Sequence, residues 1–243
     1  MVVLGAAGGI GSALTRRLAS EGARLVLAGR TPGSIALLAG ELGAHGTVVD
    51  ATRFEQVDAI FAEALELYGR VDGVVNCVGS LLLKPAHLTS ESEFLDTIAA
   101  NLTSAFAAVR AGARAMTKTG GGAIALVSSV AARTGLANHE AIAAAKAGII
   151  GLTLSAAATY ARQRIRVNCV APGLIRTPLT RKFTENETAL KASVNMHPLG
   201  RIGEPADVAS ALAWLIHRDQ SWVTGQVIGV DGGLGSLRSP ASS

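Results

Sequence analysis

The chain has 243 residues and a formal net charge of +4; 49% of its residues are hydrophobic and 16% are charged. This composition excludes a disordered chain, and without a run of Lys or Arg it gives no reason to expect nucleic-acid binding. No stretch of about 18 uninterrupted apolar residues or cleavable leader is visible, so we expect no membrane partner and a cytoplasmic location. The two cysteines, Cys77 and Cys169, lack metal-ligand spacing, and we expect no metal site.

Short apolar runs alternate with helical patterns along the whole chain. The runs predict strands at residues 1–4, 24–28, 46–49, 73–76, 123–127, 165–170 and 226–230. Helical patterns lie at 12–19, 53–68, 91–118 (as one long or two broken helices), 138–162 and 206–217. We expect residues 174–204 to form an irregular polar lid, and the tail from Leu234 to lie at the surface or in an interface.

The alternation predicts an α/β fold. We expect a doubly wound, Rossmann-type parallel sheet with helices on both faces, in a single domain that spans residues 1–243. Ligands of such sheets bind beyond the carboxyl ends of the strands. A glycine or a polar residue stands at each of those ends, namely at Gly5, Gly29, Arg30, Asp50, Asn76, Ser128, Ser129, Pro172 and Gly173.

A glycine-rich segment, GAAGGIG at residues 5–11, joins the first predicted strand to the first predicted helix. The unpaired N–H groups and the dipole of a helix N-terminus favour a pyrophosphate there. Gly5 permits a tight turn, Gly9 lets the backbone approach a phosphate, and Gly11 lets the helix pack closely on the strand. We therefore assign Gly5, Gly9, Ile10 and Gly11 to dinucleotide binding, with a plain glycine-rich turn as the alternative.

Further segments extend this pattern over nearly the whole chain. They are VVNCVG (74–79), NLTSAF (101–106), SSVAA (128–132), AAAKAGIIG (143–151), RVNCVAPG (166–173), PLGRIGEPADVA (198–209) and TGQVIGVDGG (224–233). Together they resemble the short-chain dehydrogenase/reductase family, and more loosely its ketoacyl-reductase-like branch. The resemblance implies an oxidoreductase that moves a hydride between a nicotinamide cofactor and a carbonyl or alcohol substrate.

The resemblance also implies which other residues hold the cofactor. They are Asp50 at the adenine, Asn76 and Gly79 at the adenine ribose, Lys146 at the nicotinamide ribose, and Pro172, Gly173 and Thr177 near the carboxamide and phosphates. A helix N-cap is the alternative role of Asp50.

The end of the second predicted strand bears on the choice between NAD(H) and NADP(H). An acidic residue there would bond the ribose 2′-hydroxyl, but the residues are Gly29, Arg30 and Thr31. A guanidinium can form paired hydrogen bonds to a phosphate, so Arg30 favours NADP(H) over NAD(H). The alternative role of Arg30 is that of a solvated surface residue.

The resemblance implies four catalytic residues. In the family, a tyrosine four residues before a lysine transfers the proton, and a serine thirteen residues before the tyrosine binds the substrate oxygen. An asparagine supports a water chain from the lysine. Lys146, Ser129 and Asn101 match three of these four residues. The tyrosine position holds Ile142, which cannot transfer a proton.

The chain departs from the family's pattern elsewhere too. Leu4 stands where a threonine usually precedes the first glycine, and Cys77 and Val78 replace an asparagine and an alanine. His139, three residues before Ile142 and seven before Lys146, is a possible substitute proton donor if all three share a helix face.

Two functions stay open at this stage. The first is an NAD(P)-dependent short-chain oxidoreductase with an altered proton donor and weak activity on a small carbonyl or alcohol. The second is a catalytically silent nucleotide-binding homologue that serves as a subunit beside an active relative. The resemblance implies a homo-oligomer, a tetramer or dimer formed through the long helices after Asn101 and around Lys146, in either case.

The segment 174–204 is expected to choose the substrate. It carries four basic residues that would favour an anionic or CoA-like molecule, with solvated surface charges as the alternative, and two residues suited to an apolar pocket, Phe183 and Met196. The basic residues are Arg176, Arg181, Lys182 and Lys191.

Overall fold

The structure of the protein is a computed structural model that describes residues 1–237. Within these residues, one seven-stranded parallel sheet has the strand order β3-β2-β1-β4-β5-β6-β7. The strands are β1 Val2–Leu4, β2 Val26–Gly29, β3 His45–Val48, β4 Gly73–Asn76, β5 Gly122–Val127, β6 Ile165–Pro172 and β7 Val227–Val230. The order reverses direction between β1 and β4, which is where doubly wound sheets bind ligands.

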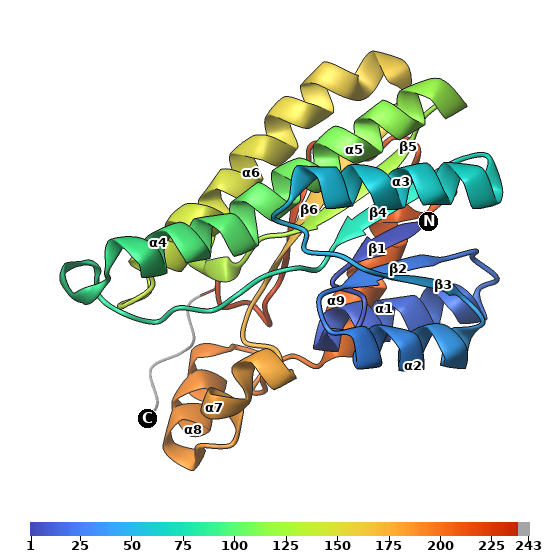
Figure 1. The fold of residues 1–243 in the computed structure, drawn as a ribbon. Helices are drawn as coiled ribbons and strands as arrows, with labels where there is room; N and C mark the ends of the chain where they lie inside the picture. The colour runs from blue at the N-terminus through green and yellow to red at the C-terminus, as the bar shows by residue number, and fades with distance from the viewer. Residues whose placement is uncertain (238–243) are drawn as a thin grey trace.

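Helices cover both faces of the sheet, as Figure 1 shows, with α3, α5 and α6 on one face and α1, α2 and α9 on the other. The helices are α1 Gly9–Ser20, α2 Pro32–Leu42, α3 Phe54–Tyr68, α4 Glu91–Ile98, α5 Ser104–Thr119, α6 Glu140–Tyr160, α7 Arg181–Thr184, α8 Glu187–Met196 and α9 Pro205–Ile216. The predicted Rossmann-type α/β fold is therefore confirmed for the described residues.

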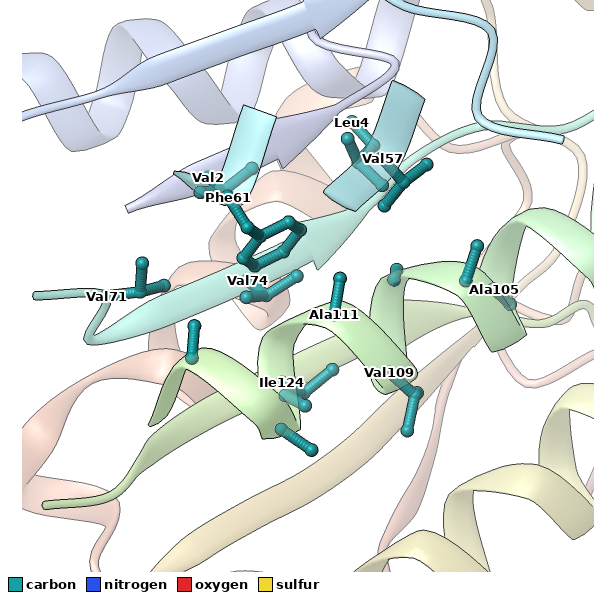
Figure 2. Packing of buried hydrophobic residues seen from close by; sticks show 14 of the residues in the cluster. Val2, Leu4, Val57, Phe61, Val71, Val74, Ala105, Val109, Ala111 and Ile124 are labelled. Carbon is teal, nitrogen blue, oxygen red and sulfur yellow. The ribbon is translucent and has the colours of Figure 1, made fainter. Parts of the chain in front are cut away.

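The two faces have separate hydrophobic cores because side chains alternate along each strand. Val2 and Leu4 of β1 point to one face, where they meet Phe61 of α3 and Val74 of β4 (Figure 2). Val3, between them, belongs to the core on the other face. Both faces are buried, so β1 has no polar position and appears in the sequence as an unbroken apolar run.

The structure differs from the sequence predictions in three places. Helix α2 was not predicted; it starts with Pro32 in its first turn and ends at Gly43, which has a left-handed φ of 58°. The stretch 174–204 is not irregular, because it contains α7 and α8. Asn186 begins α8, since its side chain accepts a hydrogen bond from the Ala189 N–H at 2.9 Å.

The third difference concerns α6, which begins at Glu140 and not at residue 138. His139 is the N-cap residue of α6 and has non-helical backbone angles. Although its backbone lies outside the regular helix, His139 lines the same cavity as Ile142, described below, whereas Lys146 does not line that cavity.

Two further expectations concern the membrane and the tail. By length and composition, the helical stretch Glu140–Gln163 is long and apolar enough to cross a bilayer, and here it packs along β6 and α5. Of the predicted surface tail, residues 238–243 lie outside the described residues, whereas Leu234 lines an internal cavity described below.

Candidate active site

The glycine-rich segment forms a compact turn between β1 and α1. Gly5 has a left-handed φ of 73°, and its carbonyl accepts a hydrogen bond from the Gly8 N–H at 3.0 Å. A Cβ at Gly11 would collide with that same Gly5 carbonyl, so only glycine lets α1 start this close to the strand. At Gly9, a Cβ would lie 2.7 Å from the Cγ2 atom of Thr177. The turn thus also brings the lid segment onto α1.

A cavity of about 240 Å³ opens beside this turn, at the carboxyl ends of β1, β2 and β4 and after β3. We call it the glycine cavity. It brings together three predicted cofactor residues, Gly5, Arg30 and Gly79. Its full lining is Leu4, Gly5, Ala7, Gly8, Ala28, Gly29, Arg30, Thr31, Ser34, Val49, Ala51, Cys77, Val78 and Gly79.

Three other predicted cofactor residues do not line the glycine cavity themselves. Asn76 is buried; its side chain donates to Ser104 Oγ at 3.2 Å and accepts from the Val78 N–H, so it shapes the loop after β4. Ile10 is half-buried against the core on the α1 face. Between β3 and α3, the Asp50 carboxylate accepts hydrogen bonds from the Thr52 N–H at 3.0 Å and from its hydroxyl at 2.8 Å.

These hydrogen bonds give Asp50 a local role. The Thr52 backbone and hydroxyl donors hold the pKa of the Asp50 carboxyl below its usual value. The N-cap residue of α3 is Arg53, so Asp50 is not itself the N-cap but holds the turn just before it.

Lys146, Asn101 and Gly79 meet beyond the ends of β4 and β5. The Lys146 ammonium donates to the Val127 carbonyl at 2.9 Å, and the Lys146 carbonyl accepts from Ser128 Oγ at 2.8 Å. A Cβ at Gly79 would lie 3.4 Å from Lys146 Nζ and 2.9 Å from Asn101 Oδ1. The structure therefore brings the predicted lysine and asparagine together at the position that a side chain at Gly79 would occupy.

Asn101 lies in a segment of π-helix, Ala99–Thr103, between α4 and α5. Its side chain donates to the Thr97 carbonyl at 2.9 Å and to Ser80 Oγ at 3.0 Å, and it accepts from the Ser80 N–H at 3.2 Å. These bonds tie the loop after β4 to the wide turn of the helix. Such one-turn widenings are frequent at functional sites.

Burial dominates the electrostatics around Lys146. The side chain is 6% exposed, and desolvation lowers its pKa to about 8. Desolvation likewise raises the pKa of the neighbouring Cys77 thiol to about 12, with Lys146 acting in the opposite direction. The raised pKa favours the neutral thiol form of Cys77 in the wall of the glycine cavity.

A second cavity, of about 390 Å³, lies between the loop after β5, the start of α6 and the lid. We call it the Ser129 cavity. It brings Ser129, Ile142, His139 and Gly173 together, whereas Pro172 ends β6 behind it. Its full lining is Leu81, Leu83, Ser129, Val130, Ala131, Leu136, Ala137, His139, Ile142, Gly173, Leu174, Thr180, Phe183, Ser193, Met196, His197 and Leu234.

The predicted apolar residues of the lid, Phe183 and Met196, line this cavity, but the basic residues do not. Arg176 and Arg181 form ion pairs with Glu204 and Glu185, at 3.1 and 3.5 Å. Lys182 and Lys191 also lie outside its lining. The expectation that the lid's basic residues prepare a pocket for an anionic substrate is therefore wrong for the cavity seen here.

His197, for which no role was predicted from the sequence, is a buried residue of the lid segment. Its Nδ1 donates to the Ser193 carbonyl at 2.6 Å, and its Nε2 accepts from the Leu174 N–H at 3.2 Å. The ring thus joins α8 to the chain leaving β6. One sequence signal could have drawn attention to His197: it stands directly before Pro198, where helix α8 ends. Helix α8 itself was not predicted.

The comparisons with known proteins match this architecture. A family model described as enoyl-(acyl carrier protein) reductase matches residues 5–235. The chain is 37% identical over 240 residues to a 3-oxoacyl-[acyl-carrier-protein] reductase of Thermotoga maritima, with 96% of each chain covered.

Solved structures agree. A short-chain type dehydrogenase/reductase from Mycobacterium ulcerans superposes with a TM-score of 0.92 at 31% identity, over 98% of this chain and 90% of that one. ElxO with NADP bound has a TM-score of 0.90 at 26% identity, over 97% and 98% of the two chains. A tyrosine-to-phenylalanine variant of ElxO was solved with NADPH bound, with a TM-score of 0.89 at 27% identity and the same coverage. By sequence and by fold, this chain belongs to the short-chain dehydrogenase/reductase family.

Proposed function

We propose that the protein is an NADP(H)-dependent oxidoreductase that interconverts a small carbonyl compound and its alcohol, with a proton donor other than the family's tyrosine. The observation that carries this proposal is the meeting of Lys146 and Asn101 at Gly79, which lines the glycine cavity, while Ile142, one turn before Lys146 on α6, lines the Ser129 cavity. A lysine beside the predicted nucleotide site and one turn from a second cavity suits hydride transfer, which requires positioning above all.

The residues of the glycine cavity fit the adenosine half of a dinucleotide. The Gly5 turn and the Gly9 N-terminus of α1 offer backbone N–H groups to phosphates. Lys146 would hold the nicotinamide ribose hydroxyls, and Thr177 of the lid, which packs on Gly9, would contact the cofactor's phosphates or carboxamide. NADP(H) would supply the hydride, and Ser129 would donate a hydrogen bond to the substrate oxygen.

The wall of the glycine cavity supports NADP(H) over NAD(H). Arg30 lies in this wall next to Thr31 and Ser34, at the N-terminus of α2, and no carboxylate lines the cavity within the described residues. A guanidinium, two hydroxyls and a helix N-terminus suit the additional 2′-phosphate of NADP(H). The NADP-bound and NADPH-bound structures of ElxO support the same choice by relationship.

Ile142 is the reason to expect slow turnover. It is 3% exposed and lines the Ser129 cavity, where a hydrocarbon neither donates nor accepts a proton. Positioned proton transfer typically contributes about 10²–10⁴-fold to a rate, so its absence from this position predicts slow turnover.

The second candidate function is that of a silent nucleotide-binding subunit, and Ile142 favours it as well. Exposed apolar side chains on α4, α5 and α6 favour an oligomer in either case; they are Phe94, Leu95, Phe106 and Leu154. We propose a homodimer or homotetramer through these helices, or a hetero-oligomer with an active relative, in the reducing cytoplasm, where the free thiols of Cys77 and Cys169 persist.

Two measurements test the proposal. Fluorescence titration with NADPH and with NADH asks whether the nucleotide binds and which one is preferred; we expect NADPH to bind more tightly. Turnover of small ketones and ketoacyl thioesters by the wild-type protein then separates the functions. Slow NADPH oxidation supports the oxidoreductase, binding without any turnover supports the silent subunit, and no nucleotide binding contradicts both.

A further inference from the structure

We propose that the Ser129 cavity takes an uncharged, apolar carbonyl compound and that His139 donates the proton to its oxygen. This inference rests on the proposed function, since it needs NADPH as the hydride source. It adds the substrate class and the missing acid.

The lining of the cavity defines the substrate class. Its side chains are mostly hydrocarbon, and they come from the loop after β4, the loop after β5, α6 and the lid. Within the described residues that line it, there is no Lys, Arg, Asp or Glu. An ionised substrate would lose its hydration without a partner, whereas an apolar ketone needs only one or two hydrogen bonds at its oxygen.

Two histidines line the cavity, and they differ in their hydrogen bonds. His197 uses both ring nitrogens, on the Ser193 carbonyl and the Leu174 N–H, and so is committed to holding the lid. His139 donates from Nδ1 to the Ala137 carbonyl at 2.7 Å, and no hydrogen bond within the described residues involves its Nε2. One nitrogen therefore orients the ring and the other is available to a ligand.

The position of His139 compensates for Ile142. Helical side chains lean toward the N-terminus of their helix, so a tyrosine at position 142 would carry its oxygen toward the first turn of α6. His139 is the residue just before that turn, about 4.5 Å along the axis from Ile142 at 1.5 Å per residue. His139, Ile142 and Ser129 all line this cavity, so a shorter side chain placed about one turn earlier offers its polar atom to the same cavity.

The reduction balances with these groups. The hydride of NADPH, a proton with two electrons, bonds to the carbonyl carbon, and the carbon–oxygen π pair moves to the oxygen. The oxygen takes the Nε2 proton of the His139 imidazolium, while Ser129 Oγ donates a hydrogen bond to it. The products are the alcohol, NADP⁺ and a neutral imidazole, which water reprotonates.

Few other titratable groups surround His139. Glu140 follows it and is exposed, His197 lines the same cavity, and Lys146 is bound to the Val127 carbonyl two turns further along α6. Lys84, whose backbone N–H donates to the carbonyl of the adjacent Asn138, is itself paired with Glu93. Of these groups, only His139 lines the cavity with a ring nitrogen that no hydrogen bond within the described residues involves.

The test uses His139→Gln, with the exposed His87→Gln as a matched control. We expect His139→Gln to lower kcat for α-tetralone at least a hundredfold and to keep NADPH affinity within twofold. The double variant His139→Gln/Ile142→Tyr is expected to regain turnover. In the absence of NADPH, α-tetralone is expected to shift the imidazole NMR signals of His139, and acetoacetate to leave them unchanged.

Unchanged kcat in His139→Gln, equal turnover of acetoacetate and α-tetralone, or no turnover by a wild-type protein that binds NADPH would each overturn this inference. All three leave nucleotide binding, and with it that part of the proposed function, intact. A protein that binds α-tetralone but not NADPH would instead contradict the proposed function.

Discussion

The glycine cavity ends at Gly79, beside Lys146, and the Ser129 cavity is lined by Ile142 one turn earlier on the same helix, yet the two are built in different ways. The first is formed largely by backbone at the ends of strands, and several of its walls tolerate only glycine. The second is formed by side chains from four segments far apart in the sequence, among them the lid. A backbone-built site suits a cofactor that many proteins share, whereas a side-chain-built site suits a substrate particular to one protein.

The largest effect is expected from the backbone site. Gly11→Val places a side chain against the Gly5 carbonyl and should displace the turn from α1. A misplacement of this kind is expected to weaken NADPH binding about a hundredfold or more. Gly40→Ala in α2 is the control, because nothing lies near its Cβ position. Fluorescence titration measures both, and normal affinity in Gly11→Val would show that the phosphates bind elsewhere.

Lys146, beside the glycine cavity, is expected to lower the free energy of unfolding because its ammonium group is desolvated. With its pKa lowered from 10.5 to about 8, the unfolded chain holds a proton between those pH values that the folded chain lacks. Stability therefore rises with pH through this window, and the cost is complete below pH 8. Lys146→Met is expected to raise the free energy of unfolding at pH 7 by about 3 kcal/mol, and by much less at pH 10.

Urea denaturation without cofactor at both pH values measures this, with the exposed Lys118→Met as control. An equal gain at pH 7 and pH 10 would mean that the side chain is charged at neither pH, or at both. The surroundings of Lys146 would then not be the dry site that the structure describes.

In the side-chain site, Ile142→Tyr should add the acid that the family's tyrosine supplies. Ser129 lines the same cavity, and Lys146 lies one turn further along α6. In the His139→Gln background, where the proposed wild-type acid is absent, we expect this change to raise kcat for α-tetralone about a hundredfold, within the range of positioned proton transfer. Ile142→Phe is the matched control, since it fills the space without a hydroxyl. An equal gain in both variants would assign the effect to packing.

The smallest effect is expected at Arg30. Its replacement by Ala removes a charge-assisted hydrogen bond to a 2′-phosphate, worth about 1.5 kcal/mol, so NADPH should bind roughly tenfold more weakly. NADH affinity should not change. If both nucleotides weaken alike, Arg30 supports the cavity wall and not the 2′-phosphate.

The contrast between the cavities also explains how far the sequence could predict the protein. The sheet, the Gly5–Gly11 turn and the grouping of Lys146 with Asn101 depend on short motifs and strand ends, which the sequence displays. Asn76 and Asp50 were found at the right edge, but only coordinates show that their side chains turn to Ser104 and Thr52. The lid was misjudged because α8 is short and has no buried residue, so neither its helix nor the role of His197 was apparent.

The account depends most on one juxtaposition: a nicotinamide ring between the two cavities, beside Ile142. Nuclear Overhauser effects between NADPH and a protein with labelled isoleucine methyl groups measure this directly. We predict contacts from the nicotinamide ring to the Ile142 methyl group and none to Ile149, which is buried in the core on the same helix. Binding of NADPH without a contact to Ile142, or no binding at all, would contradict the account.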